Sequence, residues 1–407
     1  MVLLSSHLNF NKEQKKNINT IIMVFVIVYF TDSLLFATNR LLFFYIAKRL
    51  GVVALSIVFF LRYFYRHRTF IKRDIITFFM IFSILISMVQ AGRIANGYSY
   101  ITQIACFLFA LSFSYEYRME KFIEKYLFVM KIIAITSLVG YLIGDLLVKV
   151  DIIPTITNST GKSFKSLIFT NIPLTSFSRR RNWGPFWEPG VFQVYLNIAL
   201  FFSLFSSSNK SKIDSVLFLL TLLTTLSGAA LIPAILIIGA YLFEKKNLKS
   251  GSFVILLGCL LFWFMVTGMY NEILSKIFGG VQNTSFAHRY VSIIANFKSF
   301  LRHPFFGASP EYQDELRSRM LYSLVGMNSS GTTNTFISYF SYYGGFVGSV
   351  ILYRHWKFVK AQVKSNLAAV MVFIAIFIAT SNENLTASLL ICVLPFLMSV
   401  NRFPIRV

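Results

Sequence analysis

The chain has 407 residues, of which 56% are hydrophobic and only 14% are charged. Soluble globular proteins carry about 25% charged residues, so this composition argues against a soluble domain and predicts that lipid solvates much of the surface. The 39 Lys and Arg outnumber the 16 Asp and Glu, which gives a net charge of +23. Most of these cations lie between hydrophobic runs, as membrane topology requires, so the charge does not indicate nucleic-acid binding.

Twelve hydrophobic runs predict membrane spans. They cover residues 20–37, 50–65, 75–91, 99–114, 126–148, 189–206, 215–227, 229–243, 253–269, 331–353, 367–381 and 385–400. The predicted fold is therefore an all-α polytopic membrane protein, with about 12 transmembrane helices in a single domain over residues 1–407. Leu41 to Leu50 is apolar but ends in Lys48 and Arg49, which predicts a short interfacial helix.

Basic residues follow every second run, so these connections and both termini are expected to face the cytoplasm. Two long loops, 149–188 and 270–330, then face outward, and we expect short or amphipathic helices in them. Both loops are basic, which the topology rule does not explain. An anionic ligand at the outer surface would explain the charge, and so would anionic lipid headgroups.

The densest cluster of candidate residues ends the first loop. Its arginines can chelate phosphate oxygens with planar forks, and its tryptophans can stack on sugar rings or form an aromatic belt. Glu188 precedes a helix whose first turn holds Pro189, so it can act as a helix cap or pair with a neighbouring arginine. The cluster comprises Arg179, Arg180, Arg181, Trp183, Trp187 and Glu188.

Two further clusters follow in the second half of the chain. Apolar residues recur at helical spacing from Tyr290 to Leu301, with His288 and Arg289 before them and His303 after them. This spacing predicts an amphipathic helix at the outer interface. Asn334 opens a later run, where it can cap a helix or hold a sugar hydroxyl.

These clusters resemble the O-antigen polymerase (Wzy) family and, more distantly, the O-antigen ligases. The first family pattern is matched by Arg181, Gly184, Phe186, Glu188 and Pro189, and the second by Arg289, His303, Pro304 and Gly307. The third pattern places a His before an Asn. This chain has Thr333 before Asn334, so the His is absent.

The resemblance implies polymerisation of undecaprenyl-diphosphate-linked oligosaccharide repeat units into O-antigen or a related surface polysaccharide. It also implies a multi-pass protein of the bacterial cytoplasmic (inner) membrane, with cytoplasmic termini, a periplasmic active site and membrane lipid around it. A chain-length regulator protein is left open as a partner, and no nucleic acid is implied.

The residues suit this chemistry. A diphosphate leaving group needs no general acid, metal or cofactor, and Arg181 and Arg289 can hold its developing charge. The base that accepts the hydroxyl proton is left open among Glu188, His288 and His303. The expected catalytic residues are Arg181, Arg289 and Glu188, and the expected substrate-binding residues are Arg179, Arg180, Trp183, Trp187, His288, His303 and Asn334.

Two alternative functions compete with the polymerase hypothesis. One is an O-antigen ligase, against which the missing His counts most. The other is a flippase or transporter of lipid-linked oligosaccharides, which is not an enzyme. A transporter should carry charges at mid-span and paired broken helices. The mid-span charges here are few, and the long outward loops favour an enzyme.

Overall fold

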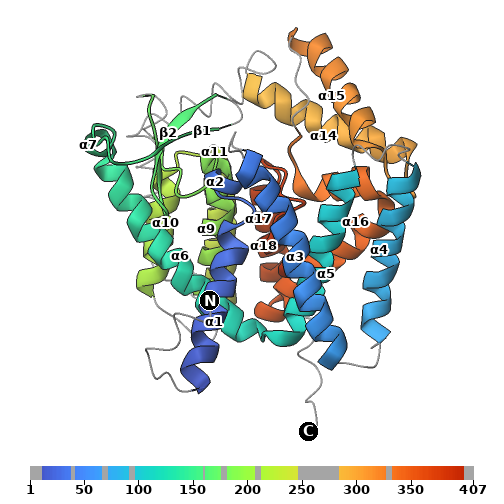
Figure 1. Ribbon diagram of the computed structural model, residues 1–407, viewed down its shortest axis with the longest axis horizontal. Helices are drawn as coiled ribbons and strands as arrows, with labels where there is room; N and C mark the ends of the chain where they lie inside the picture. The colour runs from blue at the N-terminus through green and yellow to red at the C-terminus, as the bar shows by residue number, and fades with distance from the viewer. Residues whose placement is uncertain are drawn as a thin grey trace.

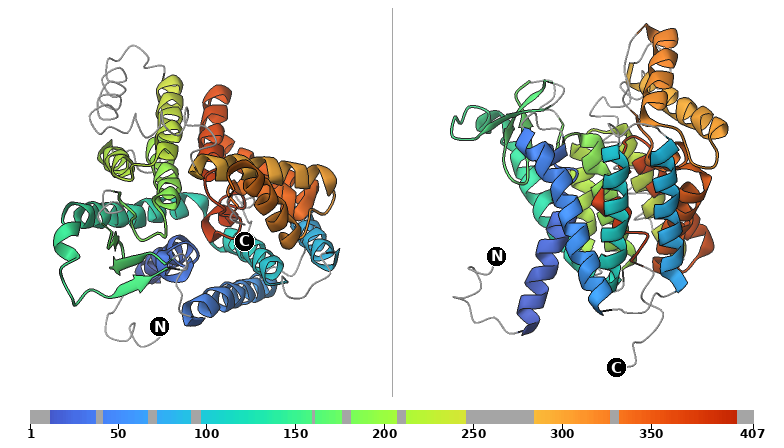
Figure 2. Two further views of the ribbon diagram at one scale, coloured as in Figure 1. Left: turned by 90° about the horizontal axis from the view of Figure 1, so that it is seen from above. Right: turned by 45° about the vertical axis from the view of Figure 1, so that its right-hand side comes forward.

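The computed structural model describes residues 12–37, 42–66, 72–90, 97–158, 161–175, 181–206, 212–245, 284–326 and 332–397. Most helices lie side by side in one bundle, while a small sheet, α14 and α15 gather at one end of it (Figure 1, Figure 2). The helices are α1 (Lys12–Tyr29), α2 (Leu34–Ala37), α3 (Leu42–Arg66), α4 (Lys72–Gln90), α5 (Gly97–Glu116), α6 (Met119–Leu142), α7 (Gly144–Leu147), α9 (Pro189–Phe205), α10 (Lys212–Thr224), α11 (Gly228–Glu244), α14 (Thr284–Arg302), α15 (Pro310–Val325), α16 (Thr335–Gln362), α17 (Asn366–Thr380) and α18 (Leu389–Val393).

Helix α9 is the buried centre of the bundle. Its sequence is apolar around the whole circumference, and every side chain from Val191 to Ser203 is buried. A helix of this composition is typical of one surrounded on all sides. Helices α6, α10, α11 and α17 supply the surrounding contacts.

Two amides inside α9 bond to the neighbouring helices. Gln193 Nε2 donates to the carbonyl of Ala379 on α17 at 2.8 Å, and Asn197 Nδ2 donates to the carbonyl of Ala230 on α11 at 3.3 Å. A buried amide left unpaired costs about 1–3 kcal/mol. These bonds therefore fix the rotation of α9, and with it the direction of the residues at its first turn.

The first long loop, in which the sequence predicted short or amphipathic helices, contains a small sheet. Strands β1 (Thr155–Thr157), β2 (Ser163–Ser166) and β3 (Asn171–Pro173) pair antiparallel in the order β1-β2-β3. The sequence feature that indicates this hairpin is local. Asn158 and Gly161 bound the turn between β1 and β2, and Gly161 has a φ of +86°. Asn and Gly at such positions favour a hairpin.

The predicted polytopic membrane fold is wrong. Among the described helices, none is both long enough and apolar enough to cross a membrane. This finding overturns the expected bundle of about 12 transmembrane helices and the multi-pass placement in an inner membrane that depended on it. Physically, α10 and α17 have only 13 and 15 residues, and longer helices such as α1 and α3 carry several charged side chains.

Most of the apolar runs nevertheless coincide with helices. The run 385–400 is an exception, because it contains only the short helix α18, and the run 253–269 lies outside the described residues. The short interfacial helix expected over Leu41 to Leu50 is also wrong. The described part of this segment, residues 42–50, forms the start of the continuous helix α3.

Helix α14 lies where the sequence predicts an amphipathic helix, and its two faces have different surroundings. Its polar residues Ser292, Asn296 and Ser299 are fully buried, whereas Phe297 and Leu301 are 52% and 61% exposed. The reason is tertiary: Asn296 Oδ1 accepts a hydrogen bond at 3.1 Å from the buried guanidinium of Arg317 on α15. The polar face therefore satisfies a buried cation.

The outer faces of α3 and α4 are apolar and exposed. Leu61 is 61% exposed, and Phe79 and Phe82 are 58% and 60% exposed. Both helices pack against α5 by their other face. They therefore bury only part of their apolar surface within the described chain.

Helix α16 is kinked at Gly344, where φ is +82°, and the turn after α14 packs into the kink. Gly345 N donates to the carbonyl of Pro304 at 2.7 Å. A Cβ on Gly344 would lie 2.0 Å from the carbonyl oxygen of Phe305. The His-Pro-x-x-Gly motif of the sequence, which ends at Gly307, therefore serves to join α14 to α16.

We expect Gly344→Ala to lower the free energy of unfolding by about 3 kcal/mol or more, because it combines backbone strain with an overlap between main chains. Gly326→Ala is the matched control, since Gly326 also has a positive φ but nothing lies within 4 Å of its Cβ position. At Gly326, backbone strain alone should lower the free energy of unfolding by about 1 kcal/mol. Denaturant unfolding followed by circular dichroism measures both values, and equal losses would contradict the packing described for the kink.

Candidate functional site

The segment before α9 is held from two sides. Asn182 N donates to the carbonyl of Thr224 on α10 at 2.9 Å, and Asn182 Nδ2 donates to Thr224 Oγ1 at 3.0 Å. On the other side, Asn171 N in β3 donates to the carbonyl of Gly184 at 2.8 Å. The sheet and α10 therefore fix the path of the residues that lead to Glu188.

Gly184 is required in this segment. Its φ is +52°, and a Cβ there would lie 2.8 Å from the ring of Phe192 on α9. Only glycine combines this backbone conformation with such close contact. The glycine of the family-like pattern therefore has a structural role.

The turn between α10 and α11 orients Arg181. Arg181 Nε donates to the carbonyl of Thr225 at 3.1 Å. The next residue, Leu226, has a φ of +46°, which is unfavourable for a branched side chain by about 1–2 kcal/mol. The strained turn brings the Thr225 carbonyl to the guanidinium.

Glu188 occupies the N-cap position of α9, yet its side chain does not cap that helix. Instead its carboxyl hydrogen-bonds to the carboxyl of Glu383, in the connection between α17 and α18. Gly190 leaves the space for this contact, because a Cβ there would lie 2.1 Å from Glu383 Oε1. The interpretation of Glu188 as a simple helix cap is therefore wrong.

The loop that carries Glu383 is fixed by the first residue of α16. Thr335 Oγ1 donates to the carbonyls of Glu383 at 2.8 Å and Thr380 at 3.1 Å, and it accepts from Leu385 N at 3.0 Å. All of these groups are buried. The Glu383 side chain is therefore held at a defined position beside α9.

Three ionisable groups from distant parts of the chain influence the protonation of Glu383. Burial raises the pKa of Glu383 well above its ordinary value, and the neighbouring Glu188 raises it further. Arg289 and Arg181 act in the opposite direction and lower that pKa. The two arginines of the predicted site therefore lie close enough to one buried carboxyl to influence its protonation.

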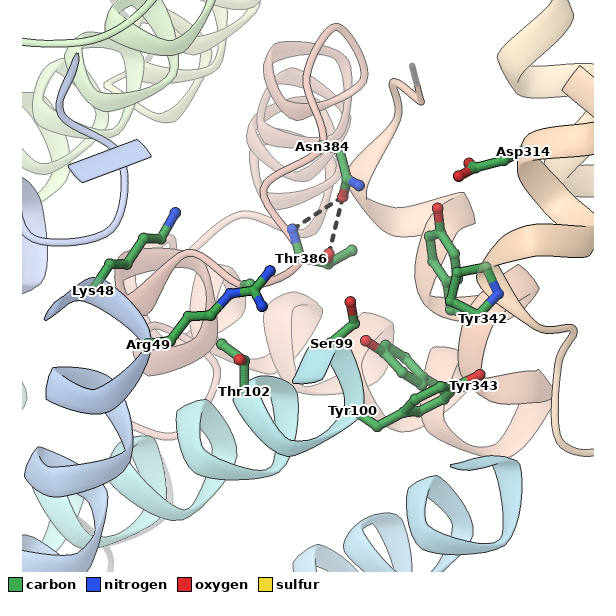
Figure 3. Close-up of a pocket in the computed structure, with 12 residues that line it drawn as sticks. Lys48, Arg49, Ser99, Tyr100, Thr102, Asp314, Tyr342, Tyr343, Asn384 and Thr386 are labelled. Atoms are coloured by element: carbon green, nitrogen blue, oxygen red, sulfur yellow. Dashed lines mark hydrogen bonds between the residues drawn. The ribbon is translucent and has the colours of Figure 1, made fainter. Parts of the chain in front are cut away.

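A cavity of about 490 Å³ opens next to this cluster (Figure 3). Lys48 and Arg49 of α3 line one side, and Asp314 and Tyr342 lie across from them. A smaller cavity of about 200 Å³ shares Lys48, Asn384 and Ala387 with it and reaches Asp32 and Trp187. Both cavities therefore adjoin the chain neighbours of Glu383 and Glu188.

The two predicted tryptophans have different surroundings. Trp183 is buried against Leu34 and Phe164, with Lys162 Nζ 5.7 Å from its ring centre, so it packs in the protein interior. Trp187 is half-buried and lines the smaller cavity. Only Trp187 is placed where a ligand could contact it.

The remaining predicted residues that the structure describes have other partners or are exposed. His303 is exposed, with its ring 5.2 Å from that of Tyr312, and His288 is half-buried on α14. Asn334 caps α16 by accepting from Ile337 N at 3.1 Å, so its side chain has a structural role. Arg179 and Arg180 lie outside the described residues.

Sequence reasoning missed Glu383, and it assigned Lys48 and Arg49 only to the end of an interfacial helix. The one sequence feature that could have indicated Glu383 was a polar run, residues 381–384, between two apolar runs. An ordinary loop has the same pattern, so the run did not identify a functional residue. Within the described ranges, no three His, Cys, Asp or Glu side chains are grouped so that they could hold a metal ion.

Comparison with models of known protein families, with curated proteins and with solved structures gives no significant match. The resemblance to O-antigen polymerases therefore depends on the motif residues alone.

The raised pKa of Glu383 makes stability depend on pH. A carboxyl whose pKa is raised by folding contributes stability that is fully present below its ordinary value of 4.5 and is lost as pH rises through the raised value. Glu383→Gln mimics the protonated form at every pH. We therefore expect the melting temperature of the variant relative to wild type to increase as pH rises from 4.5 to the raised pKa of Glu383.

Thermal unfolding in a series of buffers measures this difference. Glu120→Gln is the control, because Glu120 is exposed on α6 and its substitution should give a constant offset. A constant offset for Glu383→Gln as well would mean that Glu383 is not held protonated.

Proposed function

We propose that this protein is a glycosyltransferase that polymerises undecaprenyl-diphosphate-linked oligosaccharide repeat units. One saccharide chain leaves its lipid diphosphate and is joined to a hydroxyl of a second unit. The observation that carries the proposal is that Arg181, Arg289 and Glu188 all influence the protonation of the buried Glu383. The motif residues that resemble the polymerase family supply two arginines and one carboxylate of this cluster.

The two arginines suit a diphosphate. Guanidinium groups bind phosphate oxygens through paired, charge-assisted hydrogen bonds, and two of them can span a diphosphate. As the bond from the anomeric carbon to the diphosphate oxygen breaks, the electron pair stays on that oxygen, where fixed cations stabilise it. Arg181 has a fixed backbone partner, which reduces the entropy lost on binding.

The carboxyl pair suits proton transfer from the acceptor. Glu383 stays protonated and donates its hydrogen bond to Glu188, so Glu188 is held in one orientation. As the acceptor oxygen bonds to the anomeric carbon, its proton passes to the Glu188 carboxylate. Glu188 is thus the catalytic base, and Glu383 is a positioning residue.

Donor binding should strengthen this arrangement. Arg289 and Arg181 lower the pKa of Glu383. A diphosphate that pairs with both cations would cancel much of that effect, because its charge has the opposite sign. Glu383 would then hold its proton more firmly while the donor is bound.

We expect Arg181→Ala and Arg289→Ala each to lower polymerisation about 100-fold or more, the usual cost of removing one transition-state donor. Lys at either position should restore activity only in part, because an ammonium lacks the planar fork. The assay supplies a purified lipid-linked repeat unit in detergent and resolves the product ladder on a gel.

Arg319→Ala is the matched control for the arginines, since Arg319 is exposed and pairs with Glu315 on the surface of α15. It should leave the ladder unchanged. A normal ladder from Arg181→Ala would overturn the diphosphate assignment.

Glu188→Gln should lower turnover at least about 100-fold at every pH, because the base is removed. Wild-type activity should fall as pH rises through the raised pKa of Glu383, since the deprotonated carboxyl no longer donates to Glu188. Glu383→Gln keeps an N–H donor, so we expect it to retain activity within about 10-fold of wild type and to remove the alkaline decline.

Initial rates measured between pH 5 and about pH 10 test these expectations, with Glu120→Gln as the variant that should follow wild type. If Glu188→Gln retained full turnover while Glu383→Gln lost it, the two roles would be reversed.

A further inference from the structure

The larger cavity has the lining of a saccharide site. Hydroxyls of Ser99, Thr102 and Thr386 line it, and aromatic rings are supplied by Tyr342 and its neighbours. Asn384 Oδ1 already accepts from Thr386 Oγ1 at 2.9 Å, so its amide nitrogen is the donor offered to a ligand. Small-molecule sites of this volume combine such apolar walls with a few fixed polar groups.

Two cations distinguish this cavity from a site for a neutral sugar. Burial lowers the pKa of Lys48, and Asp32 partly offsets that effect. An anion bound beside Lys48 would raise this pKa again and favour the ammonium form. The Arg49 guanidinium lies 5.2 Å from the ring centre of Tyr98, which supports its orientation. The acidic lining residue Asp314 forms an ion pair with the buried Arg317, so part of its negative charge is compensated within the protein.

The larger cavity adjoins the chain segments that carry the carboxyl pair. Asn384, which lines both cavities, is the chain neighbour of Glu383, and Trp187 of the smaller cavity is the chain neighbour of Glu188. A saccharide in the larger cavity would therefore contact the segment that carries Glu383.

We propose that this cavity binds an acidic saccharide, with a carboxylate or phosphate substituent held by Lys48 and Arg49 and a ring hydroxyl directed toward Glu188. Its role as the acceptor site rests on the proposed function. Its ability to bind an acidic saccharide does not.

Calorimetric titration of the full chain tests the inference with three probes: digalacturonate, the neutral galactose disaccharide of the same linkage, and galactose 6-phosphate. We expect digalacturonate or the phosphate sugar to bind at least about 10-fold more tightly than the neutral disaccharide. Whichever of the two binds identifies the anionic group.

Lys48→Gln and Arg49→Gln should each weaken binding of that acidic probe about 10-fold and leave the neutral disaccharide unchanged. Lys121→Gln on α6, a helix that does not line the cavity, removes one cation elsewhere and should change nothing. Lys48→Arg should retain most of the affinity, which separates loss of charge from loss of folding.

Equal binding of acidic and neutral probes would overturn the inference, and so would acidic binding that survives both glutamine substitutions. Titration with inorganic pyrophosphate keeps the proposed function separate, because its binding should require Arg181 and Arg289 but not Lys48. Failure of pyrophosphate to bind, with acidic saccharide binding intact, would count against the diphosphate site alone.

Discussion

The hydrogen-bonded carboxyls of Glu188 and Glu383 are the constraint on which the rest of the site depends. Two carboxyl groups can share a buried position only if one of them keeps a proton, and cations nearby then decide how firmly it is kept. Burial and Glu188 act to hold the proton on Glu383, while Arg289 and Arg181 oppose it. The protonation of this pair therefore responds to any anion that binds the arginines.

Several features of the fold serve to hold this pair in place. The buried amides of α9 fix its rotation and hence the direction of Glu188. Gly190 makes room for the Glu383 carboxyl, and Thr335 at the start of α16 binds the loop that carries it. Because α16 is itself joined to α14 at its kink, the helix that bears Arg289 is connected to the same framework.

Local patterns predicted many elements correctly, and they failed where partners are distant. The apolar runs located most helices, and helical spacing located α14. The polytopic membrane fold was wrong, because average composition conceals how short or how charged the individual helices are. The sequence also contained no sign that the polar face of α14 is buried, since its partner Arg317 lies on another helix. Trp183 packs inside the protein for a similar reason: its partners Leu34 and Phe164 belong to other segments.

The sequence by itself determined where helices form and which short motifs carry arginine and glutamate, because helix formation and turn chemistry depend on residues a few positions apart. Only the tertiary structure decided that Arg181, Glu188 and Arg289 influence one buried carboxyl, that of Glu383. These groups come near one another through packing between helices distant in the chain. Burial then sets the protonation of Glu383, and burial is a property of the assembled fold rather than of any one segment.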